Sequence, residues 1–272
     1  MISLQSKYDA FCDLHTAPGA FVMPNPWDAG TAKILSAVGF SALATTSAGL
    51  AFATGRKDAE GALSLDEVLA NARDIVEACD LPVSADLENG FGTTPNDAEI
   101  AIKQAMDIGL VGGSIEDTTN DPTNPIQDFD RAVEQIQAAA QACKDRPFLL
   151  TARAENFSYG RADLADTIAR LQAFGDAGAD VLYAPELPDL QSIRILCQEV
   201  DQPVNVVMGL GDLTWSVDEL AEAGVKRISV GGSFARVALG ALIQAANEVR
   251  EHGIFSYANQ TISHTEITEM MT

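Results

Sequence analysis

The sequence predicts an α/β fold, a single-domain (β/α)₈ TIM-type barrel, and three observations carry this prediction. Eight short apolar runs alternate with longer helical patterns along the 272 residues. Most of these runs are continuously apolar, as parallel strands covered by helices are. Polar residues follow nearly every run, and no GxGxxG sequence follows the first one, which favours a closed barrel over an open doubly wound sheet.

The expected strands are short and rich in aliphatic side chains. In chain order they are Phe21–Met23, Ala42–Thr46, Pro82–Leu87, Gly112–Ile115, Phe148–Ala152, Val181–Ala184, Pro203–Met208 and Arg227–Val230. Gly39, Gly109, Gly178 and Gly224 each follow a helical run and precede a strand, which is the position of a helix C-cap. The recurrence of this unit predicts eight βα units closed into one barrel.

Helical patterns fill the intervals between the strands. Leu65–Cys79 opens with Ser64 and Glu67 at the spacing of a capping box, and Phe129–Cys143 is a second clear helix. After Val249 the periodic pattern fades, and no low-complexity linker divides the chain. We therefore expect a barrel domain over residues 1–253 and a carboxy-terminal extension over residues 254–272.

The charge balance excludes some classes of partner. The chain carries 39 acidic and 17 basic residues, a net charge of −22. A field of this sign repels phosphate backbones and anionic lipids, so we expect neither nucleic acid nor a membrane as a partner. No apolar stretch reaches the roughly 18 residues of a membrane span.

The cysteines and the amino terminus indicate a cytoplasmic location. Cys12, Cys79, Cys143 and Cys197 form no CxxC pair, and with three histidines beside them a zinc site is not expected. The first residues show no basic start followed by an apolar run, so no signal peptide is predicted.

Acidic residues follow two neighbouring strands of the predicted barrel. Asp86 and Glu88 lie on one face at the end of a strand, and Glu116 directly follows the next strand along the chain. Three carboxylates held together would repel one another and take up protons unless a cation offset their charge. A hard divalent ion is the natural partner, with Mg²⁺ the first choice and Mn²⁺ the alternative. The competing interpretation is that these are solvated loop acids in a very acidic protein.

Two further strand ends offer groups that could bind a carboxylate. Ser47, Ala48 and Gly49 provide consecutive backbone N–H groups, although a plain βα turn explains them as well. Arg153 could clamp a carboxylate through two hydrogen bonds, or it could pair with Glu155 or Glu116.

These motifs together resemble those of a known enzyme family. The run Pro82–Gly92, with the later Gly113–Asp117 and Ala152-Arg153, is similar to the phosphoenolpyruvate mutase/isocitrate lyase superfamily. The resemblance extends over roughly residues 8–250. It implies Mg²⁺ held by Asp86, Glu88 and Glu116, directly or through water, and a small 2-oxo acid chelating that ion.

The resemblance also implies a set of roles for other residues. The backbone of Ser47, Ala48 and Gly49 would hold the substrate carboxylate, and Asp58 would lie near the reacting group. The positions that match substrate-pocket residues of the methylisocitrate lyase branch are Arg153, Glu186, Asn205 and Arg236. Members of the superfamily form homo-oligomers, and tetramers exchange a carboxy-terminal helix, which here would be Ser233–Glu251.

Two motifs of the superfamily are incomplete. The isocitrate and methylisocitrate lyases carry a Lys-Lys-Cys-Gly-His motif, whereas this chain has Thr93-Thr94-Pro95-Asn96 on the matching loop. The phosphonate branch has a gating loop with a Lys and an Asn. Asn124 matches that Asn, but Pro122 stands in place of the Lys. We expect Asp117–Asp128 to be a mobile lid, with Asn124 reaching the substrate.

The function expected from these observations is a magnesium-dependent lyase or decarboxylase. It would cleave a bond beta to the keto group of an oxaloacetate-like acid through a metal-stabilised enolate. Two alternatives stay open: phosphonopyruvate hydrolase- or mutase-type cleavage of a P–C bond, and a non-catalytic protein that binds 2-oxo acids.

Overall fold

A closed ring of parallel strands forms the centre of the computed structural model, which describes residues 2–58, 61–119 and 121–272. In these residues the strands are β1 (Phe21–Met23), β2 (Leu43–Ala44), β3 (Val83–Asp86), β4 (Gly112–Glu116), β5 (Leu149–Arg153), β6 (Val181–Tyr183), β7 (Val204–Val207) and β8 (Arg227–Ser229). They lie in the order β1, β8, β7, β6, β5, β4, β3, β2 and are all parallel. The predicted (β/α)₈ barrel is confirmed.

The ring closes between β1 and β2. The amide of Ala44 donates to the carbonyl of Pro24 at 3.0 Å. Just beyond, the Asn25 side chain donates to the carbonyl of Thr45 at 2.8 Å and accepts from the amides of Val230 and Gly231, both at 2.9 Å. One buried amide side chain therefore holds the ends of β1, β2 and β8 together.

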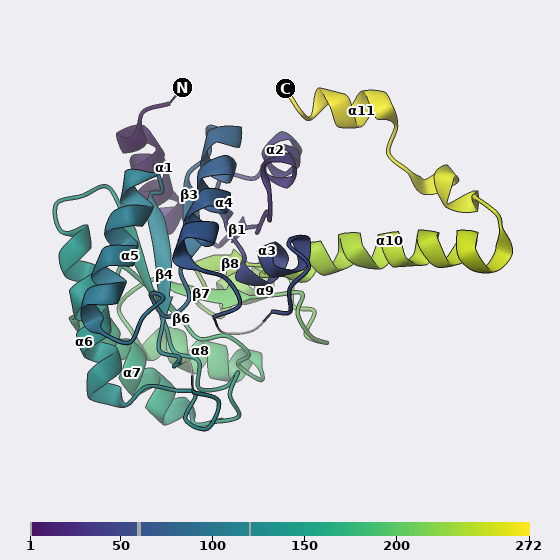
Figure 1. The fold of residues 1–272 in the computed structure, drawn as a ribbon. Coiled ribbons are helices and arrows are strands. Elements are labelled where there is room, and N and C mark those ends of the chain that lie inside the picture. The colour runs from purple at the N-terminus through teal and green to yellow at the C-terminus, as the bar shows by residue number, and fades with distance from the viewer. Residues whose placement is uncertain (1, 59–60, 120) are drawn as a thin grey trace.

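Helices surround the ring, and at the carboxyl end of the chain further helices lie away from it, as Figure 1 shows. They are α1 (Leu4–Thr16), α2 (Ala29–Val38), α3 (Ser47–Ala53), α4 (Leu65–Ala78), α5 (Pro95–Asp107), α6 (Phe129–Cys143), α7 (Leu164–Asp176), α8 (Leu190–Glu199), α9 (Val217–Glu222), α10 (Ser233–His252) and α11 (His264–Glu269), with a 3₁₀ turn, η1 (Ser256–Gln260). The capping box of Ser64 and Glu67 is present at the start of α4, and Gly39 ends α2 with a left-handed φ of 103°. These local signals place the helix ends where the sequence predicts them.

Two differences from the sequence analysis concern the second βα unit. The strand expected over Ala42–Thr46 is shorter in the structure, because pairing with β3 ends at Ala44. The backbone then turns directly into α3, a seven-residue helix that the sequence analysis did not predict. Thr46 caps this helix, since the amide of Gly49 donates to its hydroxyl at 3.2 Å. The expected turn at Ser47 is thus the first turn of a helix.

The apolar core lies between the ring and the helices. Side chains that point outward from the strands, such as Ile115 and Leu150, are fully buried against helix residues such as Ile102, Ile136 and Leu171. A second cluster around Phe11 of α1 closes the amino-terminal end of the barrel. With that end plugged, the interior is accessible from the carboxyl ends of the strands, where barrel enzymes carry their active sites.

The carboxy-terminal part of the chain leaves the barrel. Figure 1 shows α10 running away from the ring and the chain after it turning back toward α2. There the Lys33 ammonium donates to the carbonyl of Met271 at 2.6 Å. In α10 only Ser233 and Ala235 are buried. Among the described helices, none is both long and apolar enough to cross a membrane.

Candidate active site

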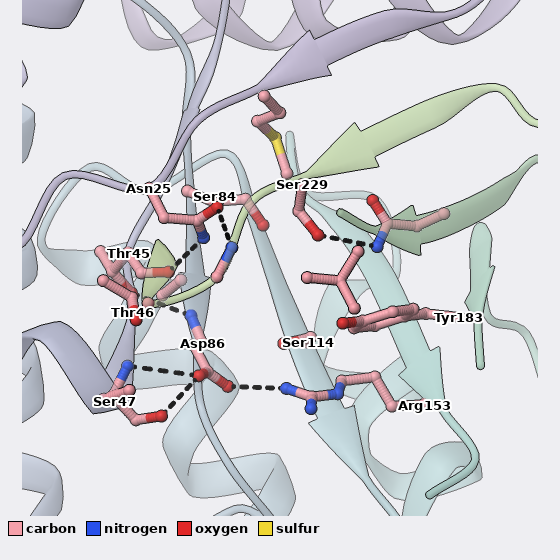
Figure 2. A pocket seen from close by; sticks show the side chains of 18 of the residues that line it. Asn25, Thr45, Thr46, Ser47, Ser84, Asp86, Ser114, Arg153, Tyr183 and Ser229 are labelled. Carbon is pink, nitrogen blue, oxygen red and sulfur yellow. Dashed lines mark hydrogen bonds and ion pairs between the residues drawn. The ribbon is translucent and has the colours of Figure 1, made fainter. Parts of the chain in front are cut away.

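A cavity of about 190 Å³ opens at the carboxyl ends of the strands and continues down the barrel axis (Figure 2). Barrel interiors are usually filled by layers of bulky branched side chains. Here several inward positions carry small polar residues instead, among them Ser84, Ser114 and Ser229. Because these side chains do not fill the axis, the barrel keeps a polar hollow inside it.

Asp86, the last residue of β3, is held in a fixed orientation at this cavity. One carboxylate oxygen accepts from the hydroxyl and the amide of Ser47, at 2.8 and 3.3 Å. The other accepts from the Arg153 guanidinium at 3.2 Å, and the Asp86 amide donates to Thr45 Oγ1 at 2.9 Å. Figure 2 shows these bonds reaching Asp86 from both sides of the cavity.

Arg153 at the end of β5 joins three carboxylates. Its guanidinium lies 3.2 Å from Asp86, 3.1 Å from Glu116 and 2.6 Å from Glu155. We call these four residues the mouth cluster. The sequence left open whether Arg153 binds a substrate or pairs with Glu155 or Glu116; in this structure it pairs with both.

The mouth cluster contains three carboxylates and only one guanidinium. Burial raises the pKa of Glu116, and the neighbouring guanidinium of Arg153 opposes that rise. Burial and the charge of Asp86 raise the pKa of Glu88 to about 7. Burial also raises the pKa of Asp58 at the rim of the cavity. A group of carboxylates whose protonated forms are favoured in this way is stabilised by an added cation.

The oxygen donors therefore fit a hard divalent ion, but they do not form a closed cage. Glu88 has a left-handed φ of 45°, its carboxylate accepts from the Gly61 backbone, and it lines a neighbouring hollow beside Phe91. Within the described ranges no three acidic, His or Cys side chains stand ready to hold a metal. Mg²⁺ retains several waters and is often held by one or two carboxylates, so Asp86 with Glu116 suits it by chemistry.

The backbone N–H groups of Ser47, Ala48 and Gly49, which are expected to bind the substrate carboxylate, are partly hydrogen-bonded within the protein itself. The amides of Ser47 and Gly49 donate to Asp86 and Thr46, while Ser47 and Ala48 line the cavity. Gly49 lies beneath them, and a Cβ there would approach Trp27 to 2.8 Å. The glycine is required for packing. Of Ser47, Ala48 and Gly49, it is Ala48 whose amide makes no bond to Asp86 or Thr46.

The structure brings some of the other predicted residues to the cavity and not others. Asp58 and Asn205 line it. Glu186 and Arg236 are exposed and lie outside its lining, and Arg236 donates to the carbonyl of Leu210 at 3.3 Å. Asn124 is also exposed, and its side chain accepts from Arg161 at 3.3 Å.

The loop expected to act as a lid has a fixed stem. Thr118 and Ile126 form an antiparallel bridge, and the amide of Gln127 donates to the carbonyl of Asp117 at 2.8 Å. The buried Asp117 carboxylate is itself paired with Arg170 at 3.0 Å. Asn120, which belongs to the predicted lid, lies outside the described residues. The stem of the loop is thus held by backbone bonds and a buried ion pair, and the lid stays a prediction.

A second buried arginine, which the sequence analysis did not single out, forms the bottom of the cavity. Arg227 donates to Asn205 and Thr151, both at 2.9 Å, and its third nitrogen lies 3.4 Å from His15 Nε2. We call these four residues the floor cluster. Burial lowers the pKa of Arg227 to about 9, and burial with the charge of Arg227 lowers that of His15 to about 4. A charged residue within an otherwise apolar strand was the signal available in the sequence.

Tyr183 was also missed. It ends β6, is almost fully buried, and lines the cavity with its ring 4.8 Å from the Arg153 guanidinium carbon. Its place near the end of the predicted strand Val181–Ala184 was the signal that could have identified it.

Comparisons with known proteins agree on one family. The family model described as phosphoenolpyruvate phosphomutase matches residues 11–250. A solved structure from Burkholderia cenocepacia, described as "a putative lyase/mutase", is 52% identical with a TM-score of 0.95 and covers 98% of this chain and 96% of that one. The structure of 2,3-dimethylmalate lyase is 25% identical with a TM-score of 0.87, over 100% and 96%. The 2-methylisocitrate lyase of Escherichia coli is 27% identical over 82% of this chain and 78% of its own.

Proposed function

Since the chain belongs to the phosphoenolpyruvate mutase/isocitrate lyase superfamily and is a lyase of that group, we propose that it cleaves a small oxaloacetate-like 2-oxo acid with Mg²⁺. The bond broken is the one beta to the keto group. The observation that carries this proposal is the mouth cluster, where Asp86 and Glu116 share one guanidinium beside a polar cavity.

In this proposal the metal supplies Lewis acidity to the keto oxygen, where negative charge develops as the bond breaks. Asp86, Glu88 and Glu116 would hold the ion, directly or through water. Arg153 then exchanges part of its carboxylate pairing for the substrate carboxylate, which it can bind through two parallel hydrogen bonds. The amide of Ala48 adds a backbone donor at the same edge of the cavity.

The charges of the cavity support an anionic substrate. Although the chain as a whole carries −22, two arginines line this one hollow, Arg153 near its mouth and Arg227 at its floor. Asn205 adds an amide beside Arg227, and Asp58 lies at the rim. Glu186 and Asn124 would reach the substrate only after their loops move toward the cavity, and Arg236 only after its side chain leaves the Leu210 carbonyl.

The loop after β3 supports a substrate other than isocitrate. On the loop where the isocitrate lyases have a catalytic Cys, this chain has the residues that begin α5. The Asp97 carboxylate accepts from the amide and hydroxyl of Thr94 at 2.8 and 2.7 Å. Among the described residues that line the cavity, none is Cys or His. The acid that such a cleavage needs is therefore not supplied by this loop.

The test is a product assay with defined substrates. The protein with Mg²⁺ should release pyruvate from oxaloacetate, and removal of the metal with EDTA should stop the release. Isocitrate should yield no glyoxylate. Thermal stabilisation by oxaloacetate with Mg²⁺ but without turnover would instead support a binding protein, and pyruvate from phosphonopyruvate alone would support P–C cleavage.

We also infer that residues 1–253 act as the catalytic unit of a homo-oligomer and that residues 254–272 form an extension. The support is the apolar surface of α10, where Val237, Leu242 and Ile243 are 71%, 63% and 59% exposed. Exposed apolar side chains gathered on one helix in this way mark a protein–protein contact, and exchange of α10 with a second copy would cover them. Light scattering should show an oligomer, and Leu242→Glu should reduce its mass while Gln244→Glu, on the same helix, does not.

A further inference from the structure

The reaction proposed above ends with an enolate that must gain a proton on carbon, so the cavity requires an acid. The groups there that can donate one are few. Among the described lining residues, those with acidic side chains are Asp58, Asp86 and Tyr183. Asp86 is assigned to the metal, and Asp58 belongs to the segment after α3 rather than to a strand of the ring. Tyr183 is the remaining acid among these lining residues, and it stands at the end of β6.

The position of Tyr183 is fixed by its neighbours. Its strand, β6, pairs with β5 so that Tyr183 stands beside Arg153. The Arg153 guanidinium carbon lies 4.8 Å from the centre of the ring, and the same guanidinium contacts Asp86 and Glu116. Figure 2 shows the ring lying along Arg153 with its hydroxyl end directed toward Ser114 and the middle of the cavity. The phenol ring and two of the carboxylates that would hold the metal thus contact the same guanidinium.

The surroundings suit a phenol that donates a proton and takes it back. Burial raises the pKa of Tyr183, so the hydroxyl is protonated at neutral pH. Arg153 and a hydrogen bond with Ser229 oppose that rise, and Tyr183 in turn interacts electrostatically with Arg227. A phenolate formed briefly at this position would therefore have a guanidinium on two sides. The carboxylates that disfavour it, Glu155 and Asp86, are themselves paired with Arg153.

We propose that Tyr183 is the general acid that protonates carbon 3 of the enolate. This role rests on the proposed function. For an oxaloacetate-like substrate, the bond from carbon 3 to the departing carboxyl carbon breaks, CO₂ leaves, and the electron pair moves onto the keto oxygen. Carbon 3 then forms a bond to the Tyr183 proton as the ketone re-forms, and the phenolate takes a proton from solvent.

The experiment compares Tyr183→Phe with the unaltered protein at saturating Mg²⁺. Phenylalanine keeps the ring beside Arg153 and removes only the hydroxyl. We expect kcat to fall by about 10²- to 10⁴-fold, the usual contribution of a general acid, with KM little changed. Two progress curves are followed in dilute buffer: loss of oxaloacetate absorbance, and pyruvate formation coupled to lactate dehydrogenase. In the variant, pyruvate should lag behind oxaloacetate loss, because enolpyruvate is released and tautomerises in solution.

The controls separate this role from a structural one. Tyr8→Phe removes a phenol hydroxyl at the opposite end of the barrel and should leave both curves unchanged. Calorimetry should give the same Mg²⁺-dependent oxalate affinity for Tyr183→Phe as for the unaltered protein. An unaltered kcat without a lag in Tyr183→Phe, while the unaltered protein is active, would overturn the role of Tyr183 alone. Absence of Mg²⁺-dependent turnover in the unaltered protein would overturn the proposed function and this role together.

Discussion

The mouth and the floor of the cavity each contain one buried arginine, yet the two arginines have opposite surroundings. Arg153 at the mouth contacts three carboxylates, whereas Arg227 at the floor bonds to neutral partners, Asn205 and Thr151, with the neutral ring of His15 nearby. The mouth cluster therefore carries excess negative charge and the floor cluster an unpaired positive charge. A molecule with a cation at one end and an anion beyond it, such as a metal with a bound acid, would match this gradient.

The largest effect should come from removing the central acid of the mouth cluster. Asp86→Ala should abolish Mg²⁺ binding and reduce turnover by at least about 10³-fold, since the ion would lose one of the few carboxylates available to hold it. The fold should remain intact. Calorimetry with Mg²⁺, beside a circular dichroism spectrum, measures both. An unchanged Mg²⁺ affinity in this variant would show that the ion, if any, binds elsewhere.

The two arginines should differ in their contribution to stability. Arg153→Met leaves Glu116 and Glu155 buried without a positively charged partner and should cost about 3–5 kcal/mol of unfolding free energy. Arg227→Met leaves only neutral groups unpaired and should cost about 1–3 kcal/mol. Denaturant unfolding of both variants at pH 8 measures the difference. Equal losses would mean that the contrast between mouth and floor has no energetic consequence.

The floor cluster should also make the protein sensitive to acid. The pKa of His15 is about 4 in the folded chain and about 6.5 when unfolded, so between these values the unfolded state binds more protons. The stabilisation is complete above pH 6.5 and is lost as pH falls toward 4, by up to about 3 kcal/mol. His15→Gln should flatten this part of the stability profile, whereas the exposed His264→Gln should leave it unchanged.

Local patterns in the sequence predicted the parts of the fold and site that depend on neighbours along the chain. The capping box at Ser64 and the C-cap at Gly39 depend on such neighbours, and both are present. Asp86 and Arg153 followed from strand periodicity alone, because every strand of a parallel barrel ends at the same rim. The structure places both at the cavity.

Contacts between distant parts of the chain set the remainder. Arg227 meets His15 across 212 positions, and no periodic pattern encodes that contact. The orientation of Glu88 depends on a left-handed backbone conformation, which is uncommon for a glutamate and could not be predicted from its residue type. The short α3 has too few residues for helical periodicity to be recognised, and its start is set by Thr46 capping rather than by an apolar repeat.

The way Asn25 closes the ring has a consequence for the motions of the protein. Elsewhere the ring is held by continuous ladders, but among the described residues β1 and β2 are connected by one backbone bond, from Ala44 to Pro24, and by the Asn25 side chain. Local opening starts where few bonds must break, so this joint should open at a lower free energy than its neighbours. In hydrogen exchange, the amides of Val230 and Gly231, which bond to Asn25, would then become labelled together with that of Ala44. The barrel would then open locally between β1 and β2, beside the turn at Gly231 and Gly232 that borders the cavity.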